Sequence, residues 1–262
     1  MSQPPPQPAA FTQFCTLPVE SLGRRILFEN EDFLVVDKPA HWLVHPTKPD
    51  GPPTLWNELC QLLAYELLGG GQVSCVNRLD RETSGLLLVA KNKRTARHLS
   101  RLIKRSEIEK AYLAICWGEA PASPFTVDAP IIRQGNVRES RIWLKRSIDP
   151  AGDPAVTHCR RLAQWQKNGQ TFSLIEARPL TGRTHQIRVH LSSIGLPIVG
   201  DKLYGPDENL YLEFIQTGWT PRLAGKLLLS RHALHATRLA FDAPQAYRFS
   251  SPLPADLHRL LP

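Results

Sequence analysis

Apolar residues along the chain follow two spacings, and these predict a sheet with a few helices. Strand-length apolar runs occupy residues 25–28, 33–37, 73–76, 86–90, 110–117, 156–162, 172–178 and 234–241. The first two runs are separated by a short polar turn, and Asn168-Gly169 is a strong hairpin signal between two later ones. Because hairpin links dominate, we predict an α+β fold: a mostly antiparallel mixed sheet with flanking helices.

Helical spacing appears in fewer places. Thr54 is a plausible N-cap for a helix with a leucine face that runs to Leu67, and Gly69-Gly70-Gly71 ends it. Residues 91–105 and the stripe Ile187, Leu191 and Ile194 predict two more helices, and a short one is expected near Leu257. Arg183 then lies at a junction between a strand and a helix.

The helix expected over residues 91–105 carries five cations on one face: Arg94, Arg97, Arg101, Lys104 and Arg105. Such a face is commonly just solvated. No acidic residue lies among these cations, however, so pairing one helical turn apart cannot account for them. We favour contact with a phosphate backbone, with Arg97 and Arg101 at its centre.

The composition indicates which partners, compartment and cofactors to expect for this protein. The 262 residues carry a formal net charge of +8, which favours a polyanionic partner such as nucleic acid. No apolar run is long enough to cross a bilayer, so no membrane association is expected. The five cysteines are widely spaced, which indicates a reducing cytoplasm. The nine histidines form no metal-ligand cluster, and no glycine-rich phosphate loop is present, so neither a metal nor a cofactor is expected.

Two units are expected along the chain. Residues 1–23 are rich in proline and read as a disordered leader, and residues 24–262 read as one globular domain. We expect this domain to act as a monomer.

Residues 76–85, Val-Asn-Arg-Leu-Asp-Arg-Glu-Thr-Ser-Gly, precede the apolar run at 86–90. This places Asp80 on a turn at the edge of the sheet, flanked by Arg78 and Arg81. Asp80 is therefore a candidate catalytic carboxylate. The alternative is that Asp80 or Thr83 only caps the turn, as short polar side chains often do.

Four segments together resemble the RluA-type pseudouridine synthases, in that family's order: Lys38-Pro39, residues 78–85, Lys110-Ala111-Tyr112 and residues 181–188. Residues 200–205 extend the match, which covers about residues 24 to 242. The resemblance implies an isomerase that acts on structured ribosomal or transfer RNA. Such an enzyme detaches the uracil of a chosen uridine and rejoins it through carbon, without a metal or cofactor.

The resemblance also implies roles for particular residues. Asp80 matches the essential aspartate, which acts as a nucleophile or base on a flipped-out uridine. Arg183 is expected to pair with it, because a buried carboxylate needs an opposite charge to stay ionised. Tyr112 matches the tyrosine that stacks on the target base.

Two further positions carry alternatives. Arg78 matches a residue that fills the space left by the flipped base, and phosphate contact is its other possible role. Ile187 resembles an aliphatic residue of the same pocket, although ordinary helix packing explains it almost as well.

The chain departs from the family at two points. Asn77 stands where relatives commonly have histidine, and it cannot carry a charge. The residues before Arg24 are too few for the RNA-binding module of the S4 type that many relatives carry. We therefore expect the catalytic domain itself, including the basic helix, to bind RNA.

Two other functions remain as alternatives. A non-catalytic RNA-binding or chaperone protein on the same fold would have little reason to keep Asp80, Tyr112 and Arg183 together. A base-excising DNA glycosylase would also use an aspartate, but it would not explain the two long motif matches.

Overall fold

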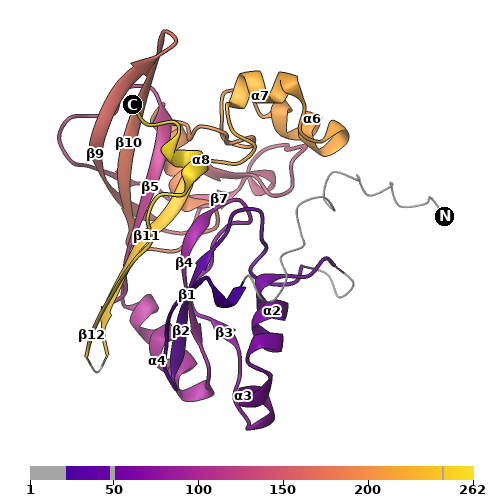
Figure 1. The fold of residues 1–262 in the computed structure, drawn as a ribbon. Coiled ribbons are helices and arrows are strands. Elements are labelled where there is room, and N and C mark those ends of the chain that lie inside the picture. The colour runs from indigo at the N-terminus through magenta and orange to yellow at the C-terminus, as the bar shows by residue number, and fades with distance from the viewer. Residues whose placement is uncertain (1–21, 48–50, 244) are drawn as a thin grey trace.

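A ten-stranded sheet organises the molecule in this computed structural model, which describes residues 22–47, 51–243 and 245–262 (Figure 1). Eight strands follow one another in the order β1-β2-β4-β11-β5-β10-β9-β6, while β3 pairs with β4 and β12 pairs with β11. The strands are β1 (Ile26–Glu29), β2 (Phe33–Lys38), β3 (Ser74–Cys75), β4 (Ser84–Ala90), β5 (Glu109–Trp117), β6 (Phe125–Asp128), β9 (Val156–Lys167), β10 (Gln170–Pro179), β11 (Leu234–Asp242) and β12 (Ala246–Ser250). A separate hairpin pairs β7 (Ile131–Arg133) with β8 (Arg146–Ile148).

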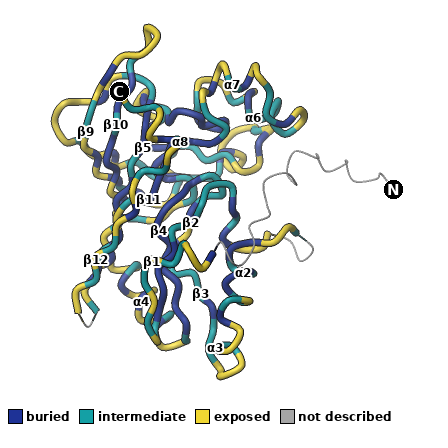
Figure 2. Tube along the Cα trace, in the orientation of Figure 1, coloured by how far each residue is buried: buried dark blue, intermediate teal, exposed yellow. Residues whose placement is uncertain are grey.

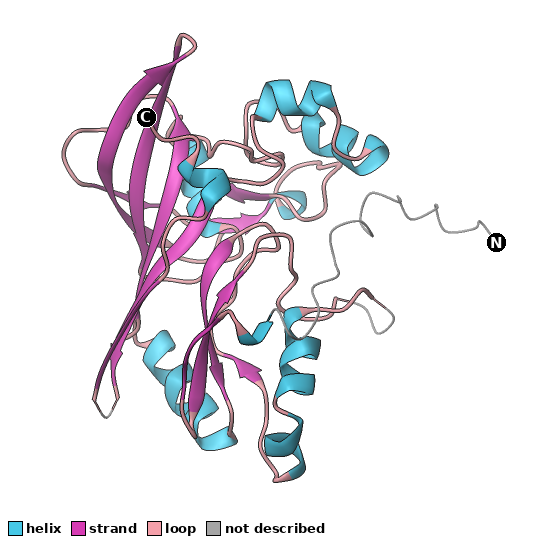
Figure 3. Ribbon diagram, in the orientation of Figure 1, coloured by secondary structure: helices cyan, strands magenta, loops and turns pink. Residues whose placement is uncertain are grey.

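Helices flank this sheet (Figure 3). They are α2 (Leu55–Leu62), α3 (Ala64–Leu68), α4 (Lys93–Lys104), α5 (Gln186–Ser193), α6 (Asn209–Thr217), α7 (Pro221–Leu227) and α8 (Ala255–His258), with one 3₁₀ turn, η2 (Gln134–Asn136). The predicted α+β class is confirmed, because every strand pairing except one is antiparallel among the described strands.

The apolar run of β4 is buried along its whole length because both faces of the sheet are covered there (Figure 2). Leu87 and Val89 belong to the main core, while Leu86, Leu88 and Ala90 belong to a second core on the other face. Alternate side chains of a strand point to opposite faces, so one strand serves two cores. Helix α4 closes the second core, and α2 contributes to the main one.

The hairpins expected from sequence are confirmed. β1 pairs antiparallel with β2, and β9 pairs antiparallel with β10 through a tight turn at Asn168 and Gly169. Both turn residues have positive φ, 52° and 73°, as a two-residue hairpin turn requires. Both strands of this second hairpin are longer than the pattern predicted.

One parallel pairing, between β4 and β11, joins the strands β1, β2 and β4 to the rest of the sheet. β11 pairs with β4 over only two positions, His235 opposite Ser84 and Ala236 opposite Gly85. Gly85 has φ +108°, and a Cβ atom there would lie 2.7 Å from the amide nitrogen of Ala236. The close approach therefore requires glycine at this position.

Some helices differ from expectation. The helix expected from Thr54 to Leu67 is split at Leu63 into α2 and α3, although Thr54 does cap its start. Helices α6 and α7 were not predicted from the apolar spacing. Thr220-Pro221 is a sequence signal for the second, because Thr220 caps α7 through the amide of Leu223.

The leader expected over residues 1–23 lies outside the described residues as far as residue 21. Leu22, the first described residue, is buried in the main core.

Candidate active site

The turn that carries Asp80 is fixed to the sheet on both sides. Before it, the Asn77 amide donates to the Leu86 carbonyl at 3.1 Å and accepts from the Leu88 amide at 2.8 Å. After it, Thr83 Oγ1 contacts His232 Nε2 at 2.7 Å, so the turn is tied to the segment leading into β11. Asn77 therefore has a structural task at this position that needs no charge.

Asp80 itself is left partly open to solvent. Its side chain is 25% exposed, and its carbonyl oxygen, not its carboxylate, accepts the turn hydrogen bond from Thr83. The carboxylate is therefore not used up in capping the turn.

The counter-charge of Asp80 is Arg188, and the expected pairing with Arg183 was wrong. Arg188 Nη1 donates to Asp80 Oδ2 at 2.8 Å. Arg183 instead lies in the loop before α5, where its Nε donates to the Pro154 carbonyl at 3.1 Å and its Nη1 is 3.6 Å from Asp153.

The start of α5 explains this difference. The helix begins at Gln186, and its residues from Gln186 to Leu191 are all buried. Arg188 is carried inward on this helix, whereas Arg183 precedes it and is 41% exposed at its side chain. The signal in the sequence was an arginine within a run of otherwise core-forming residues, since a buried arginine must be paired.

Asp201 holds Arg188 in place. Its two carboxylate oxygens accept from Arg188 Nε and Nη2 at 2.7 and 3.0 Å, a bidentate contact. The same carboxylate accepts from the amides of Leu203 and Tyr204. Burial opposes the charge on Asp201, but Arg188 outweighs burial and keeps the pKa of that carboxyl well below its ordinary value.

The charges around Asp80 keep it ionised. Burial acts to raise its pKa, but the positive charges of His185, Arg188 and His232 outweigh burial and lower the pKa to about 2. Burial also lowers the pKa of His185 to about 4 and that of His232 to about 3, so both imidazoles are neutral at pH 7. Among these three neighbours, Arg188 therefore supplies the positive charge at neutral pH.

Tyr112 and Ile187 lie in the same core cluster beside this pair. Tyr112, on β5, is 8% exposed, and Ile187, next to Arg188 on α5, is 6% exposed. Burial raises the pKa of the Tyr112 phenol, and the charge of Asp80 raises it further, so the hydroxyl stays protonated at neutral pH. Residues from three distant segments thus meet at Asp80.

Buried cations for which no role was predicted surround the turn. Lys38 Nζ donates to the carbonyl oxygens of Pro39, Trp42 and Arg81 at 2.9 to 3.2 Å. Burial lowers the pKa of Lys38 to about 7, although the charge of Asp80 opposes this. Lys202 forms a buried ion pair with Glu82 at 2.8 Å.

Arg231 is a third buried cation at the turn. It pairs with Asp256 of α8 and donates to the Glu82 carbonyl at 3.3 Å. Together with Lys38 and Lys202, it fixes the backbone around Asp80.

The remaining predicted residues lie farther out. Arg78 is exposed, two positions before Asp80. Arg97 and Arg101 are exposed on α4 and line a depression of about 580 Å³, together with Gln72 and Ser74. The structure therefore places Tyr112 near Asp80 and Ile187 beside Arg188, and it leaves Arg97 and Arg101 on α4.

Within the described part of the chain, no group of three or more histidine, cysteine or acidic side chains is arranged to hold a metal ion. No helix in that part is both long enough and apolar enough to cross a membrane.

Comparisons with known proteins show which family this chain resembles. The model of a family described as RNA pseudouridylate synthase matches residues 32–193. The ribosomal large subunit pseudouridine synthase D of Zymomonas mobilis is 37% identical over 247 residues, which cover 92% of this chain and 73% of that protein. An uncharacterized RNA pseudouridine synthase of Chloroflexus aurantiacus is 39% identical over 231 residues, which cover 86% of this chain and 64% of that protein.

Two solved structures of human RNA pseudouridylate synthase domain proteins also resemble this chain. The human RNA pseudouridylate synthase domain containing 4 matches with a TM-score of 0.70 and 26% identity, over 92% of this chain and 95% of that one. The human RNA pseudouridylate synthase domain containing 1 matches with a TM-score of 0.66 and 29% identity, over 90% of this chain and 85% of that one.

Proposed function

This chain belongs to the RNA pseudouridylate synthase family and is an RNA-modifying isomerase, and from that premise we propose that Asp80 is its catalytic carboxylate. The observation that carries the proposal is the 2.8 Å contact of a partly open carboxylate with a buried arginine. An ionised carboxylate can act as a nucleophile or as a base, and Asp80 is ionised throughout the neutral range.

The reaction moves one bond. The bond from N1 of the uracil to the sugar breaks, the bond from C5 to the same sugar carbon forms, the hydrogen on C5 leaves as a proton, and N1 gains a proton. The target uridine must leave its stack before Asp80 can reach it. Tyr112 then offers a ring on which the extruded base stacks, with Ile187 packed in the same cluster.

Arg188 and Asp201 complete this assignment. Arg188 is a binding partner of Asp80 that keeps it charged and oriented, and Asp201 is a positioning residue that acts through Arg188. Arg has the planar, permanently charged fork that this double contact needs.

We propose ribosomal RNA as the first substrate to test and transfer RNA as the second. The support is that several relatives are named for the ribosomal large subunit. Arg78, Arg97 and Arg101 are proposed to contact this RNA, because they are exposed cations near the turn and on α4.

We also propose that residues 24–262 act as a monomeric catalytic unit in the cytoplasm. The four described cysteines form no disulfide, as a reducing compartment requires. Light scattering on the purified chain tests the monomer.

The substitution Asp80→Asn tests the catalytic role. It removes the ionised oxygen and keeps the shape, so we expect turnover to fall by at least about a thousandfold while RNA binding is retained. Tritium release from RNA labelled with [5-³H]uridine measures turnover, because the C5 hydrogen leaves in the reaction. Appreciable release by the variant would rule the role out.

The substrate can be identified in cells. Pseudouridine is mapped in total ribosomal and transfer RNA from cells that lack the protein, complemented with wild type or with Asp80→Asn. A site that disappears and returns only with wild type names the target uridine.

A further inference from the structure

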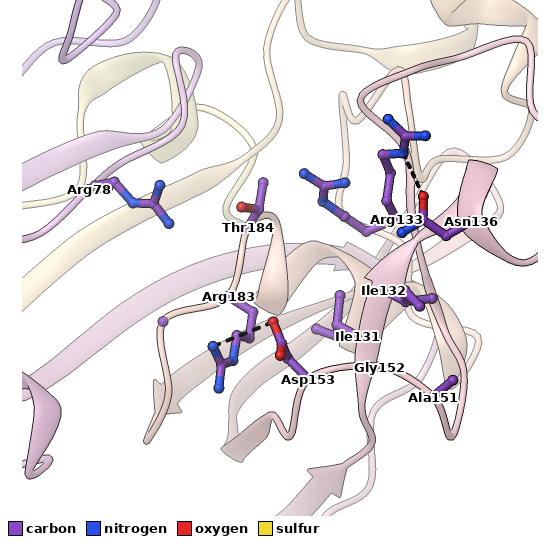
Figure 4. Close-up of a pocket in the computed structure, with 12 residues that line it drawn as sticks. Arg78, Ile131, Ile132, Arg133, Asn136, Ala151, Gly152, Asp153, Arg183 and Thr184 are labelled. Atoms are coloured by element: carbon purple, nitrogen blue, oxygen red, sulfur yellow. Dashed lines mark hydrogen bonds and ion pairs between the residues drawn. The ribbon is translucent and has the colours of Figure 1, made fainter.

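A cavity of about 400 Å³ lies beside the active site, between the turn of Asp80, the loop before α5 and the β7–β8 hairpin (Figure 4). Four arginines line it: Arg78, Arg133, Arg146 and Arg183. Asp153 is the one carboxylate in the lining. We call this cavity the arginine pocket. Its excess of positive charge favours an anionic ligand.

The pocket is built as one piece with the helix that carries Arg188. The backbone amide of Arg146 donates to the Tyr204 hydroxyl at 2.9 Å, and that hydroxyl contacts His185 Nδ1 at 2.8 Å. Ile131 of β7 and Tyr204 also share an apolar cluster with Val189 of α5. The hairpin therefore keeps a fixed position relative to the Asp80–Arg188 pair.

The segment beside the hairpin, residues 151–153, is also fixed. The backbone of Asp153 exchanges two hydrogen bonds with Ile131, at 2.9 and 3.0 Å. A Cβ atom at Gly152 would lie 2.6 Å from the Ile131 carbonyl carbon, so glycine allows this close contact.

Two of the arginines are held before any ligand arrives. The Arg133 guanidinium lies 3.5 Å from the centre of the Trp143 ring, and its Nε donates to Asn136 at 3.1 Å. Arg183 donates to the Pro154 carbonyl. Because these side chains are already ordered, less entropy is lost when they bind an anion.

Asp153 competes only weakly with an anionic ligand for Arg183. Asp153 is 71% exposed and lies 3.6 Å from Arg183, and an exposed pair of this kind contributes little stability. A phosphodiester offers two oxygens in the geometry that a guanidinium fork binds, and it can replace this carboxylate.

We propose that the arginine pocket binds the phosphate backbone of the substrate RNA beside the target nucleotide, with Arg183 and Arg133 each contacting a phosphate. Arg183, which does not pair with Asp80, thus contacts the RNA backbone, whereas Arg188 pairs with Asp80 in the active site. This proposal rests on the proposed function, because it names where the same RNA is gripped.

The test compares Arg183→Gln and Arg133→Gln with a matched control, Arg178→Gln. Arg178 is also half-exposed and also paired with a carboxylate, Glu176, but it lies on β10 outside the pocket. The probe is total RNA labelled with [5-³H]uridine, taken from cells that lack the protein. Tritium release gives kcat and KM, and the same RNA binding to Asp80→Asn versions gives the salt dependence of affinity.

Each pocket substitution should raise KM about tenfold, as expected for one lost charge-assisted hydrogen bond, while kcat stays within about twofold. The slope of log affinity against log salt should fall by about 0.7 to 0.9 per substitution, because one phosphate contact is lost. The Arg178→Gln control should match wild type in both measurements.

Unchanged KM and salt slope in both pocket variants would overturn the proposal. A fall in kcat alone for Arg183→Gln would overturn it as well, because Arg183 would then act on the chemistry. If the wild type released no tritium, the proposed function would fail, yet the salt slopes of the binding measurements would still decide the pocket.

Discussion

Arg188 contacts two carboxylates, and each uses different nitrogens of its guanidinium. Asp201 takes Nε and Nη2, which leaves Nη1 for Asp80. Asp201, which binds two nitrogens at once, fixes the plane of the Arg188 guanidinium. Nη1 therefore points at Asp80 without another contact. This arrangement keeps Asp80 both charged and positioned at the edge of the solvent.

Arg188→Gln should make the reaction sensitive to mild acid. In the wild type, the pKa of Asp80 is about 2, so the carboxylate is ionised across the neutral range and kcat/KM does not depend on its protonation. Without the arginine, the strongest remaining neighbours of Asp80 are histidines that are neutral at pH 7, so burial raises the pKa of Asp80. Activity needs the ionised form, so kcat/KM should fall as the pH drops through this raised pKa.

The profile of kcat/KM between pH 4.5 and 8, measured by tritium release, checks this expectation. Arg188→Lys keeps a positive charge and serves as the control, with a lower rate but no such acid limb in that range. A flat profile for Arg188→Gln would contradict the assigned role. Circular dichroism confirms that each variant is folded, since Asp201 also loses its partner.

From the sequence we predicted correctly that an arginine pairs with Asp80, but we chose Arg183 instead of Arg188. Two arginines lie five positions apart in the same motif, and both fit a buried carboxylate in charge and shape. The choice depends on where the helix begins, because the residues from Gln186 onward are buried, whereas Arg183 lies before the helix. Helix starts are among the least certain features of a sequence, so the spacing alone could not decide.

Helix α4 was predicted nearly in full, and the five cations expected on one of its faces are all exposed. Leu99 and Leu102 pack into the second core, and Asn92 caps the helix through the amide of Thr95. Arg97 and Arg101 are exposed and line the depression on its surface. An amphipathic period of this strength fixes which side faces the core, and the cations are left outside.

Arg97→Gln and Arg101→Gln together should weaken RNA binding without changing the chemistry. The slope of log affinity against log salt should fall by about 0.7 for each lost phosphate contact. Filter binding of total RNA at several salt concentrations measures the slope. Arg222→Gln on α7 is the matched control, because Arg222 is equally a helical, exposed arginine. An unchanged slope in the double variant would place this face in bulk solvent.

Elements without a strong period were harder to predict. The break between α2 and α3 follows no Pro or Gly, and Tyr65 and Leu68 on α3 are largely exposed despite their apolar character. Helices α6 and α7 form a small separate cluster around Leu210, Leu223 and Leu227. Tertiary packing decides such short segments more than local preference does.

At the level of the whole molecule, the sheet consists of two parts that meet at β4 and β11. The hairpins within each part could be predicted because their strands are close in sequence. The meeting of the parts could not, since it brings residues 84 and 85 beside residues 235 and 236. Asp80 belongs to one part, while Tyr112 and Arg188 belong to the other.

Gly85→Ala should strain this junction. The residue has φ +108°, and the added Cβ would meet the backbone of Ala236, so we expect a loss of about 3 kcal/mol in unfolding free energy. Urea denaturation followed by circular dichroism measures the change. Gly225→Ala is the control: nothing lies within 4 Å of its added Cβ, and alanine in α7 should leave stability unchanged or higher. Equal stability of the two variants would contradict this account of the junction.

The strand order also sets when the sheet can be completed. β11 lies between β4 and β5, yet it is made after both of them and after β9 and β10, because synthesis proceeds from the N-terminus. Until residues 234–242 emerge, no strand of the sheet connects β4, which follows Asp80, to β5, which carries Tyr112. A nascent chain therefore lacks the sheet junction between the strand after Asp80 and the strand of Tyr112 until β11 has been made.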